Sequence, residues 1–252
     1  NFVKEFEDIN GSKSSFSLSV QDTSNDKYLK LYRVKSNLVD YEKDNLESTL
    51  NFTHENEDLF LGFNAAVYET LKDSYNDKYE YIIPELTIDK NLFSNNEFGN
   101  LDLQTNFKVH NYDTNKLTSF LINDFDWNFK DFNFKSGLKG KFLANVRNIN
   151  YEAKNIDIYK RDTTNELYGA LGYLTQLNLE KTSNDKKHKL KPKVLFRYSP
   201  NNNMRKEDSG STLSPINAFN INRLDSTNNY ETGFSTTLGL DYEILRNSKE
   251  FD

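Results

Sequence analysis

Two runs of basic side chains are the residues in this sequence whose type and spacing suggest chemistry. The runs are Lys135, Lys139, Lys141 and Arg147, and Lys189, Lys191, Lys193 and Arg197. Alternate residues of a β-strand share one face, so each run would form a row of cations. Such a row could hold phosphate groups through charge-assisted hydrogen bonds. The other interpretation is an ordinary solvated strand face.

The remaining polar side chains show no catalytic or metal-binding pattern. His54, His110 and His188 lie far apart in the sequence and lack metal-ligand spacing. The chain has no cysteine, so it can form neither a disulfide nor a thiolate metal site. No nucleophile elbow and no phosphate-binding loop occurs. We therefore expect no enzymatic activity, no metal and no cofactor, with the histidines on the surface or facing an interior channel.

The second basic run lies in one of two long alternating segments that bracket a polar loop. In 187–199 one face carries mainly apolar residues and the other carries the cations, and 230–245 alternates in the same way. A period of two residues predicts β-strands. Both segments exceed the mean soluble strand of roughly 5 to 6 residues. They suit a tilted transmembrane strand of about 9 to 11 residues.

The rest of the chain repeats this pattern, so we expect about eleven or twelve strands and hardly a helix. The other predicted strands are 2–9, 14–22, 27–39, 46–55, 59–70, 78–89, 99–111, 117–129, 132–147 and 167–181. Pro84 should lie at a sheet edge, a bulge or a strand start, since proline removes a ladder donor. Links at 130–131 and 182–186 are tight, while those at 148–166 and 200–229 are long.

Composition limits the class of protein. The chain has 252 residues, a formal charge of -6 and a mean hydropathy of -0.81. No stretch approaches the roughly 18 apolar residues of a membrane helix, which excludes a helical membrane protein. The mild acidity argues against a nucleic-acid binder. Low hydropathy does not exclude a membrane barrel, whose strands are apolar on one face only.

These observations predict an antiparallel up-and-down transmembrane β-barrel, present here in part, with residues 1–252 forming a fragment of that barrel domain and no second domain. The alternative is a soluble β-sandwich in which the apolar rows pack on one another. Aromatic residues near strand ends could form interfacial girdles or a sandwich core. They are Tyr28, Tyr32, Tyr68, Tyr79, Trp127, Phe129, Tyr151, Tyr198 and Tyr230.

Three stretches in the C-terminal half carry a resemblance to a known family. They are KPKVLFRYSP at 191–200, NAFNINR at 217–223, and the strand that opens with YETG at 230–233 and continues through GLDY at 239–242. In this order they resemble the barrel of the LPS-assembly protein LptD family, also called organic solvent tolerance proteins. YIIPEL at 81–86 also resembles a Leu-Pro-Glu-Leu-like strand of that family. The sequence departs from the family where 226–229 replaces a Gly-x-Asp-Arg element and where Ala218 replaces a common leucine.

The resemblance implies a function for the barrel. The protein would sit in the outer membrane of a Gram-negative bacterium, take lipopolysaccharide from an LptA-like periplasmic bridge and insert it into the outer leaflet, with an LptE-like lipoprotein plug in the lumen. The basic rows could then line the lumen and hold phosphorylated glycolipid headgroups. Two other hypotheses stay open: a soluble or surface-attached all-β binding or adhesion module, and a simple diffusion porin.

Overall fold

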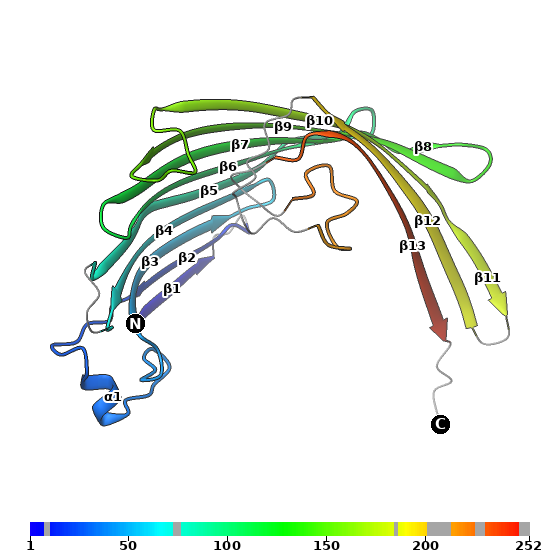
Figure 1. Ribbon diagram of the computed structural model, residues 1–252. Helices are drawn as coiled ribbons and strands as arrows, with labels where there is room; N and C mark the ends of the chain where they lie inside the picture. Colours follow the sequence, from blue (N-terminus) through cyan, green and yellow to red (C-terminus); the bar gives the residue numbers. More distant parts are fainter. Residues whose placement is uncertain (8–10, 73–76, 184–185, 201–212, 225–229, 247–252) are drawn as a thin grey trace, which may run out of the picture. The chain divides into compact units, whose positions relative to one another are not determined.

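The computed structural model confirms the predicted all-β class. It describes residues 1–7, 11–72, 77–183, 186–200, 213–224 and 230–246, and within these it forms an antiparallel sheet of thirteen strands (Figure 1). The strand order is β1-β2-β3-β4-β5-β6-β7-β9-β10-β12-β11, with β13 paired to β12 and β8 paired to β9. In the described residues the order does not return to its start, so the sheet is unclosed.

Most strand boundaries lie within three residues of the predicted segments, β4 matches its prediction at both ends, and β5 runs six residues past the predicted end at 89. The strands are β1 Phe2–Glu7, β2 Lys13–Ser19, β3 Asn45–Glu55, β4 Leu59–Thr70, β5 Tyr79–Asn95, β6 Gly99–Tyr112, β7 Lys116–Asn128, β8 Phe132–Asn133, β9 Leu138–Lys154, β10 Thr164–Leu177, β11 Leu179–Ser183, β12 Lys186–Ser199 and β13 Gly233–Arg246. The link predicted at 148–166 is shorter than expected, because β9 and β10 extend into it. Parts of the links at 182–186 and 200–229, and the end of the strand predicted at 2–9, lie outside the described residues.

The chain forms two compact units. Unit 1 comprises Asn1–Leu92, Leu103–Asp124 and Asn148–Glu166, and unit 2 comprises Phe93–Asp102, Phe125–Arg147 and Leu167–Asp252.

In unit 1, neighbouring rows of side chains across the sheet differ in polarity. One row runs in register through Ser17, Asn51, Asn64 and Glu85. Asn51 donates to Ser17 at 3.3 Å, and Asn64 donates to Glu85 at 2.8 Å. The adjacent row runs through Phe16, Phe52, Phe63 and Leu86. Because successive residues point to opposite faces, one face of this sheet is a hydrogen-bonded polar ladder and the other is apolar.

Pro84 lies at a β-bulge, one of the three positions predicted for it. The register between β4 and β5 shifts between Asn64 and Ala66, opposite the segment that contains Pro84. β5 is an interior strand, so the bulge rather than a sheet edge accommodates the missing N–H donor. The extra residue also changes the phase of the alternation. Ile83 before the bulge and Leu86 after it are both exposed.

The strand predicted at 27–39 is wrong. This segment contains a short helix, α1 (Tyr28–Tyr32), followed by turns. Leu29 is buried against Leu46 and Leu71, with Val34, Val39 and Tyr41 packed around them. Apolar residues at 29, 34 and 39 therefore meet in a small local core, and this packing overrides the weak alternation of the sequence.

The single strand predicted at 132–147 is also wrong in its first half. β8 and β9 form a hairpin whose turn includes Gly137, with a φ of +82° that favours glycine. The strand predicted at 167–181 is likewise divided, at Asn178, into β10 and β11, which both pair with β12. Within the described residues, no helix is long and apolar enough to cross a membrane.

Candidate functional site

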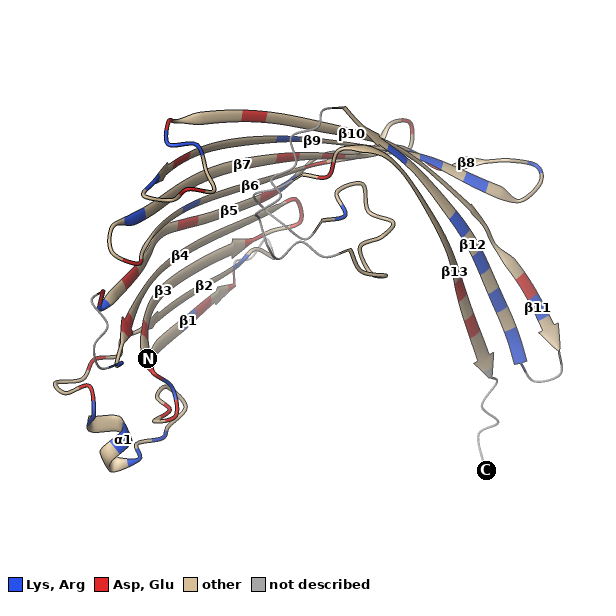
Figure 2. Ribbon diagram, in the orientation of Figure 1, with Lys and Arg blue, Asp and Glu red and all other residues tan. Residues whose placement is uncertain are grey.

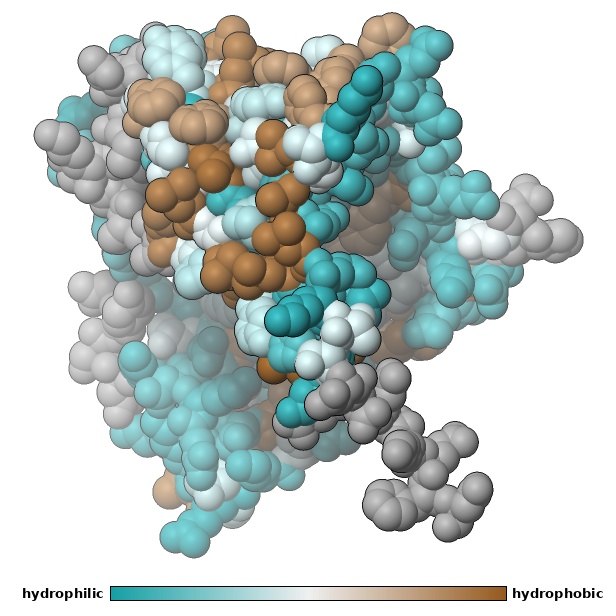
Figure 3. All heavy atoms as spheres, turned by 90° about the vertical axis from the view of Figure 1, so that its right-hand side faces the viewer, coloured by the Kyte–Doolittle hydropathy of each residue, from teal (hydrophilic) through white to brown (hydrophobic). Residues whose placement is uncertain are grey.

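In unit 2 the two faces of β9, β10, β12 and β13 differ sharply in polarity and burial. On one face Leu171, Phe234 and Leu238 are 67%, 70% and 75% exposed. On the other face Asn145 and Arg197 are each only 1% exposed. We call these the apolar face and the polar face of unit 2. Figure 3 shows apolar residues gathered in the upper part of the side that carries β12 and β13. Buried polar side chains and a patch of exposed large apolar side chains are the two features of this distribution that need an explanation.

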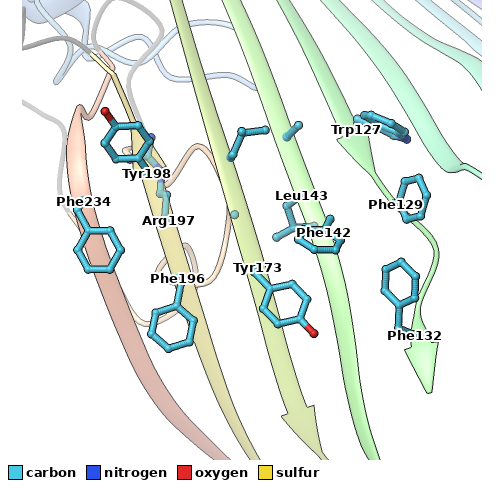
Figure 4. A pocket seen from close by; sticks show the side chains of 13 residues that line it. Trp127, Phe129, Phe132, Phe142, Leu143, Tyr173, Phe196, Arg197, Tyr198 and Phe234 are labelled. Atoms are coloured by element: carbon cyan, nitrogen blue, oxygen red, sulfur yellow. The ribbon is translucent and has the colours of Figure 1, made fainter. Parts of the chain in front are cut away.

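A continuous series of aromatic rings crosses the apolar face. Trp127 lies 5.3 Å from Phe129, Phe129 lies 5.7 Å from Phe132, and Phe132 lies 5.8 Å from Phe142, between ring centroids. Phe142 in turn lies 4.7 Å from Tyr173. The rings border a groove of about 560 Å³ (Figure 4). The Trp127 indole N–H donates to the Phe98 carbonyl at 2.8 Å, so its polar atom is satisfied.

The aromatic residues predicted for interfacial girdles lie in three different surroundings. Trp127, Phe129 and Tyr198 line the groove on the apolar face. Tyr151 and Tyr230 are buried, at 3% and 0% exposed, so the expectation is wrong for both. Tyr28 and Tyr32 lie on α1 rather than on a strand. Alternation alone places a residue on one of two faces and does not show which face another segment covers.

A segment of the β12–β13 link folds onto the polar face of unit 2. We call residues 213–224 and 230–232 the strap. Its centre is an ion pair in which the Arg223 guanidinium binds both carboxylate oxygens of Glu231 and also donates to the Thr237 hydroxyl at 2.8 Å. Arg197 of β12 donates to the backbone carbonyl oxygens of Ile221 at 2.6 Å and Glu231 at 2.8 Å. Side chains of β12 and β13 therefore hold both parts of the strap.

The ion pair keeps Glu231 charged. Burial by itself raises the pKa of this carboxyl, but the hydrogen bonds and charge of Arg223, with the charge of Arg197, outweigh burial and hold the pKa below its ordinary value. Arg197 Nη1 lies 4.0 Å from a Glu231 oxygen and, within the described residues, has no hydrogen-bond partner. Its charge is nevertheless compensated by the same carboxylate.

Tyr230 links the strap to β9 and β10. Its hydroxyl donates to the Asn145 side-chain oxygen at 2.6 Å, and Asn145 donates to Asp126 at 2.9 Å. The Tyr230 ring stacks on Tyr168 at 5.4 Å. The Arg147 and Arg197 guanidiniums lie 5.8 and 5.5 Å from the ring centroid, within range of cation–π attraction.

Two glycines make room for apolar side chains of the strap. A Cβ atom added at Gly239 of β13 would lie 2.5 Å from the ring of Phe219, and one added at Gly172 of β10 would lie 2.8 Å from Cδ1 of Ile221. Real Cβ atoms essentially never approach so closely. The Lys193 ammonium lies 4.4 Å from the centre of the Phe219 ring and completes this contact.

The predicted basic rows are only partly present. Lys139, Lys141 and Arg147 share one face of β9, but Lys135 lies in the β8–β9 turn and is not part of that row. Lys189, Lys191, Lys193 and Arg197 share one face of β12. Lys189 pairs with Glu243 at 3.3 Å and Lys193 with Asp241 at 2.9 Å (Figure 2). Arg147 and Arg197 are buried near Tyr230. The rows are therefore interrupted by acidic partners and by the strap.

Each histidine has a local partner. His54 Nδ1 lies 2.8 Å from the Ser14 hydroxyl, His110 Nε2 lies 2.6 Å from Glu80, and His188 Nδ1 lies 2.7 Å from the Tyr242 hydroxyl. In the described part of the chain, no group of three or more His, Asp or Glu residues could hold a metal ion.

Comparison of the sequence with known protein families and with curated proteins finds no match. The strap lies mainly in the link predicted at 200–229, which includes the family-like element at 217–223, and its packing on the polar face was not predicted from the sequence. The available signals were Gly172 and Gly239 within otherwise regular strands, since such glycines often mark the close approach of another segment.

Proposed function

We propose that this chain forms part of the wall of an outer-membrane β-barrel that transports lipopolysaccharide to the outer leaflet. One observation carries the membrane assignment: the sheet exposes large apolar side chains on one face, while the opposite face is polar, hydrogen-bonded and partly buried. This is the polarity of a strand that faces lipid on one side and a polar interior on the other.

The soluble alternative fits this arrangement poorly. A β-sandwich packs its apolar rows on one another. In unit 2 the apolar row of β13 is instead exposed, with Leu238 at 75%, Leu240 at 60% and Tyr242 at 57%. A contiguous exposed patch of this kind marks a membrane or protein interaction site. Within a bilayer every strand edge must also be paired, so the proposal requires partners for the edges of β1 and β13.

The lipopolysaccharide assignment rests on the resemblance of 191–242 to the LptD family. The chemistry is binding and passage of a glycolipid, without a covalent step, between an LptA-like bridge, an LptE-like plug and the outer leaflet. Lys139, Lys141 and Lys191 lie on the polar face of unit 2 and are suited to phosphate contacts.

The single tryptophan provides the membrane test. Trp127 lies on the apolar face, so in lipid vesicles its fluorescence should be quenched by phospholipids that carry bromine on their acyl chains. Because Trp127 lies near the end of β7, bromine close to the headgroup should quench more than bromine at the chain terminus. A monodisperse, folded protein in plain buffer, with Trp127 unquenched by vesicles, would overturn the membrane assignment.

The lipopolysaccharide assignment needs a separate measurement. Protein purified from native membranes should carry a phosphorylated glycolipid and a lipoprotein, both detectable by mass spectrometry. A barrel that passes the Trp127 test and carries neither would be a diffusion porin instead.

A further inference from the structure

We propose that the strap is a permanently seated obstruction on the polar face of unit 2, which keeps small hydrophilic solutes from passing along β10, β12 and β13. This inference rests on the proposed barrel, since it requires the polar face to line an interior. It adds a role for a specific segment, residues 213–224 and 230–232, that the barrel assignment does not supply.

Buried arginine side chains anchor the strap. Arg197 is 1% exposed and donates to two strap carbonyl oxygens, at 2.6 and 2.8 Å. Arg223 is 7% exposed and binds both oxygens of Glu231. A bidentate pair of this kind restricts geometry as well as adding energy. Releasing the strap would leave the buried Arg197 charge without its compensating carboxylate, which is costly.

The strap also fits the shape of the strands beneath it. Phe219 and Ile221 occupy positions that only glycine at 239 and 172 leaves free. We call the spaces left by these two glycines the notches. They lie on different strands, β13 and β10, and β12 lies between these strands, so the strap crosses β12 as well. A strand face covered only by water would have room for larger side chains at both positions. Glycine in a strand interior also weakens the strand.

The strap covers only part of the polar face. It covers the half of β12 that contains Leu195 and Arg197, which are 0% and 1% exposed. The half that contains Lys189 and Lys191 remains partly exposed. The strap therefore divides the polar face into a covered part and an open part that bears the lysines.

The test fills one notch and leaves a matched glycine as control. Gly239→Ala places a methyl group against Phe219, whereas a Cβ at Gly169 of β10 would meet only the Asn145 carbonyl oxygen, at an ordinary 3.6 Å. In Gly239→Ala we expect backbone hydrogen exchange in 213–224 to rise roughly tenfold, which corresponds to about 1.4 kcal/mol and lies within the range for over-packing. The potassium chloride conductance per reconstituted molecule should rise with it. Gly169→Ala should change neither quantity.

A compensating variant distinguishes release of the strap from general damage. Gly239→Ala combined with Phe219→Leu removes the ring that meets the new methyl group, so exchange and conductance should both return toward the original values. If Gly239→Ala does not fold, Phe219→Ala, which introduces no clash, must raise both readouts on its own. Unchanged conductance in a variant with faster strap exchange would overturn the proposal.

Trp127 quenching in the same vesicles separates the two levels of inference. If Trp127 is quenched and conductance does not respond to the notch variants, the barrel stands and the obstruction is rejected. If Trp127 is not quenched, the barrel itself is rejected and the obstruction with it.

Discussion

At the scale of single residues, the buried charged side chains of this protein contribute more to its stability than the exposed ones. The spacing of the lysines and arginines predicts two uniform rows, but the structure gives the members of these rows different environments. Arg197 and Arg147 are buried beside an aromatic ring, while Lys189 and Lys193 form exposed or half-exposed pairs. Exposed pairs contribute little to stability, and a buried pair broken on one side costs far more.

Replacing Glu231 by glutamine should destabilise unit 2 measurably. The substitution removes the carboxylate that compensates Arg223 and Arg197. We expect a loss of about 3 kcal/mol, at the lower end for a broken buried pair because the Glu231 side chain is still 18% exposed. The measurement is chemical unfolding in detergent micelles. Glu243→Gln is the control, since its pair with Lys189 is exposed and should be worth less than about 1 kcal/mol. Equal losses in both variants would contradict the prediction.

The pH dependence of the same variant gives a second readout. The pKa of Glu231 is lower in the folded protein than its ordinary value of 4.5, so its contribution is fully present above that value. The contribution is lost as the pH falls through the lowered pKa, because the unfolded state then binds the proton more readily. The original protein should therefore lose stability below about pH 4.5 more steeply than Glu231→Gln, in which this group cannot titrate. Parallel pH profiles would show that the ion pair is not the source.

At the scale of elements, long alternating strands were predictable and interruptions were less so. The β4 prediction is confirmed at both ends, and the Pro84 prediction is confirmed as a bulge. The strand predicted at 27–39 failed because its apolar residues pack around Leu29 in a local cluster. The strand predicted at 132–147 failed because a tight turn interrupts it at Gly137.

The bulge at Pro84 leads to a prediction about β5. In an uninterrupted strand, residues three apart lie on opposite faces. Here Ile83 and Leu86 are both exposed, at 45% and 37%, because the bulge shifts the alternation. Spin labels on single cysteines at both positions should therefore show oxygen accessibility in lipid, while labels at Ile82 and Glu85 should contact an aqueous relaxant. Opposite accessibility at Ile83 and Leu86 would show that β5 is regular.

At the scale of the whole molecule, the question is which solvent covers the apolar face. Substitution of an exposed leucine changes the stability of the protein by different amounts in the two candidate environments, water and lipid. In water, a substitution at a position as exposed as Leu238 changes stability by less than about 0.5 kcal/mol. In a bilayer, a lysine on the lipid face costs about 2–4 kcal/mol near the midplane.

Leu238→Lys should therefore be strongly destabilising when the protein is folded in lipid vesicles. We expect a loss of about 2–4 kcal/mol in reversible unfolding from vesicles, reduced toward the strand ends. Thr237→Lys is not a suitable control because Thr237 contacts Arg223. Glu243→Gln on the polar face is again the control, because Glu243→Lys would introduce repulsion with Lys189. A neutral effect of Leu238→Lys would favour a water-covered face.

The sequence by itself determined the all-β class, most strand boundaries and the division of each strand into an apolar and a polar row. It could do so because strand alternation is local, with a period of two residues that neighbouring positions encode directly. It also contained the signs of close backbone approach at Gly172 and Gly239, although only as glycines in strands.

Only the tertiary structure decided which polar residues are covered and by what. The hydrogen bond from Tyr230 to Asn145 joins residues 85 positions apart, and Phe219 and Ile221 pack against glycines of two different strands, β13 and β10. No short-range pattern specifies such contacts, because they form between surfaces that exist only once the sheet is assembled. The strap, the burial of Arg197 and the exposure of the apolar face are therefore properties of the assembled sheet.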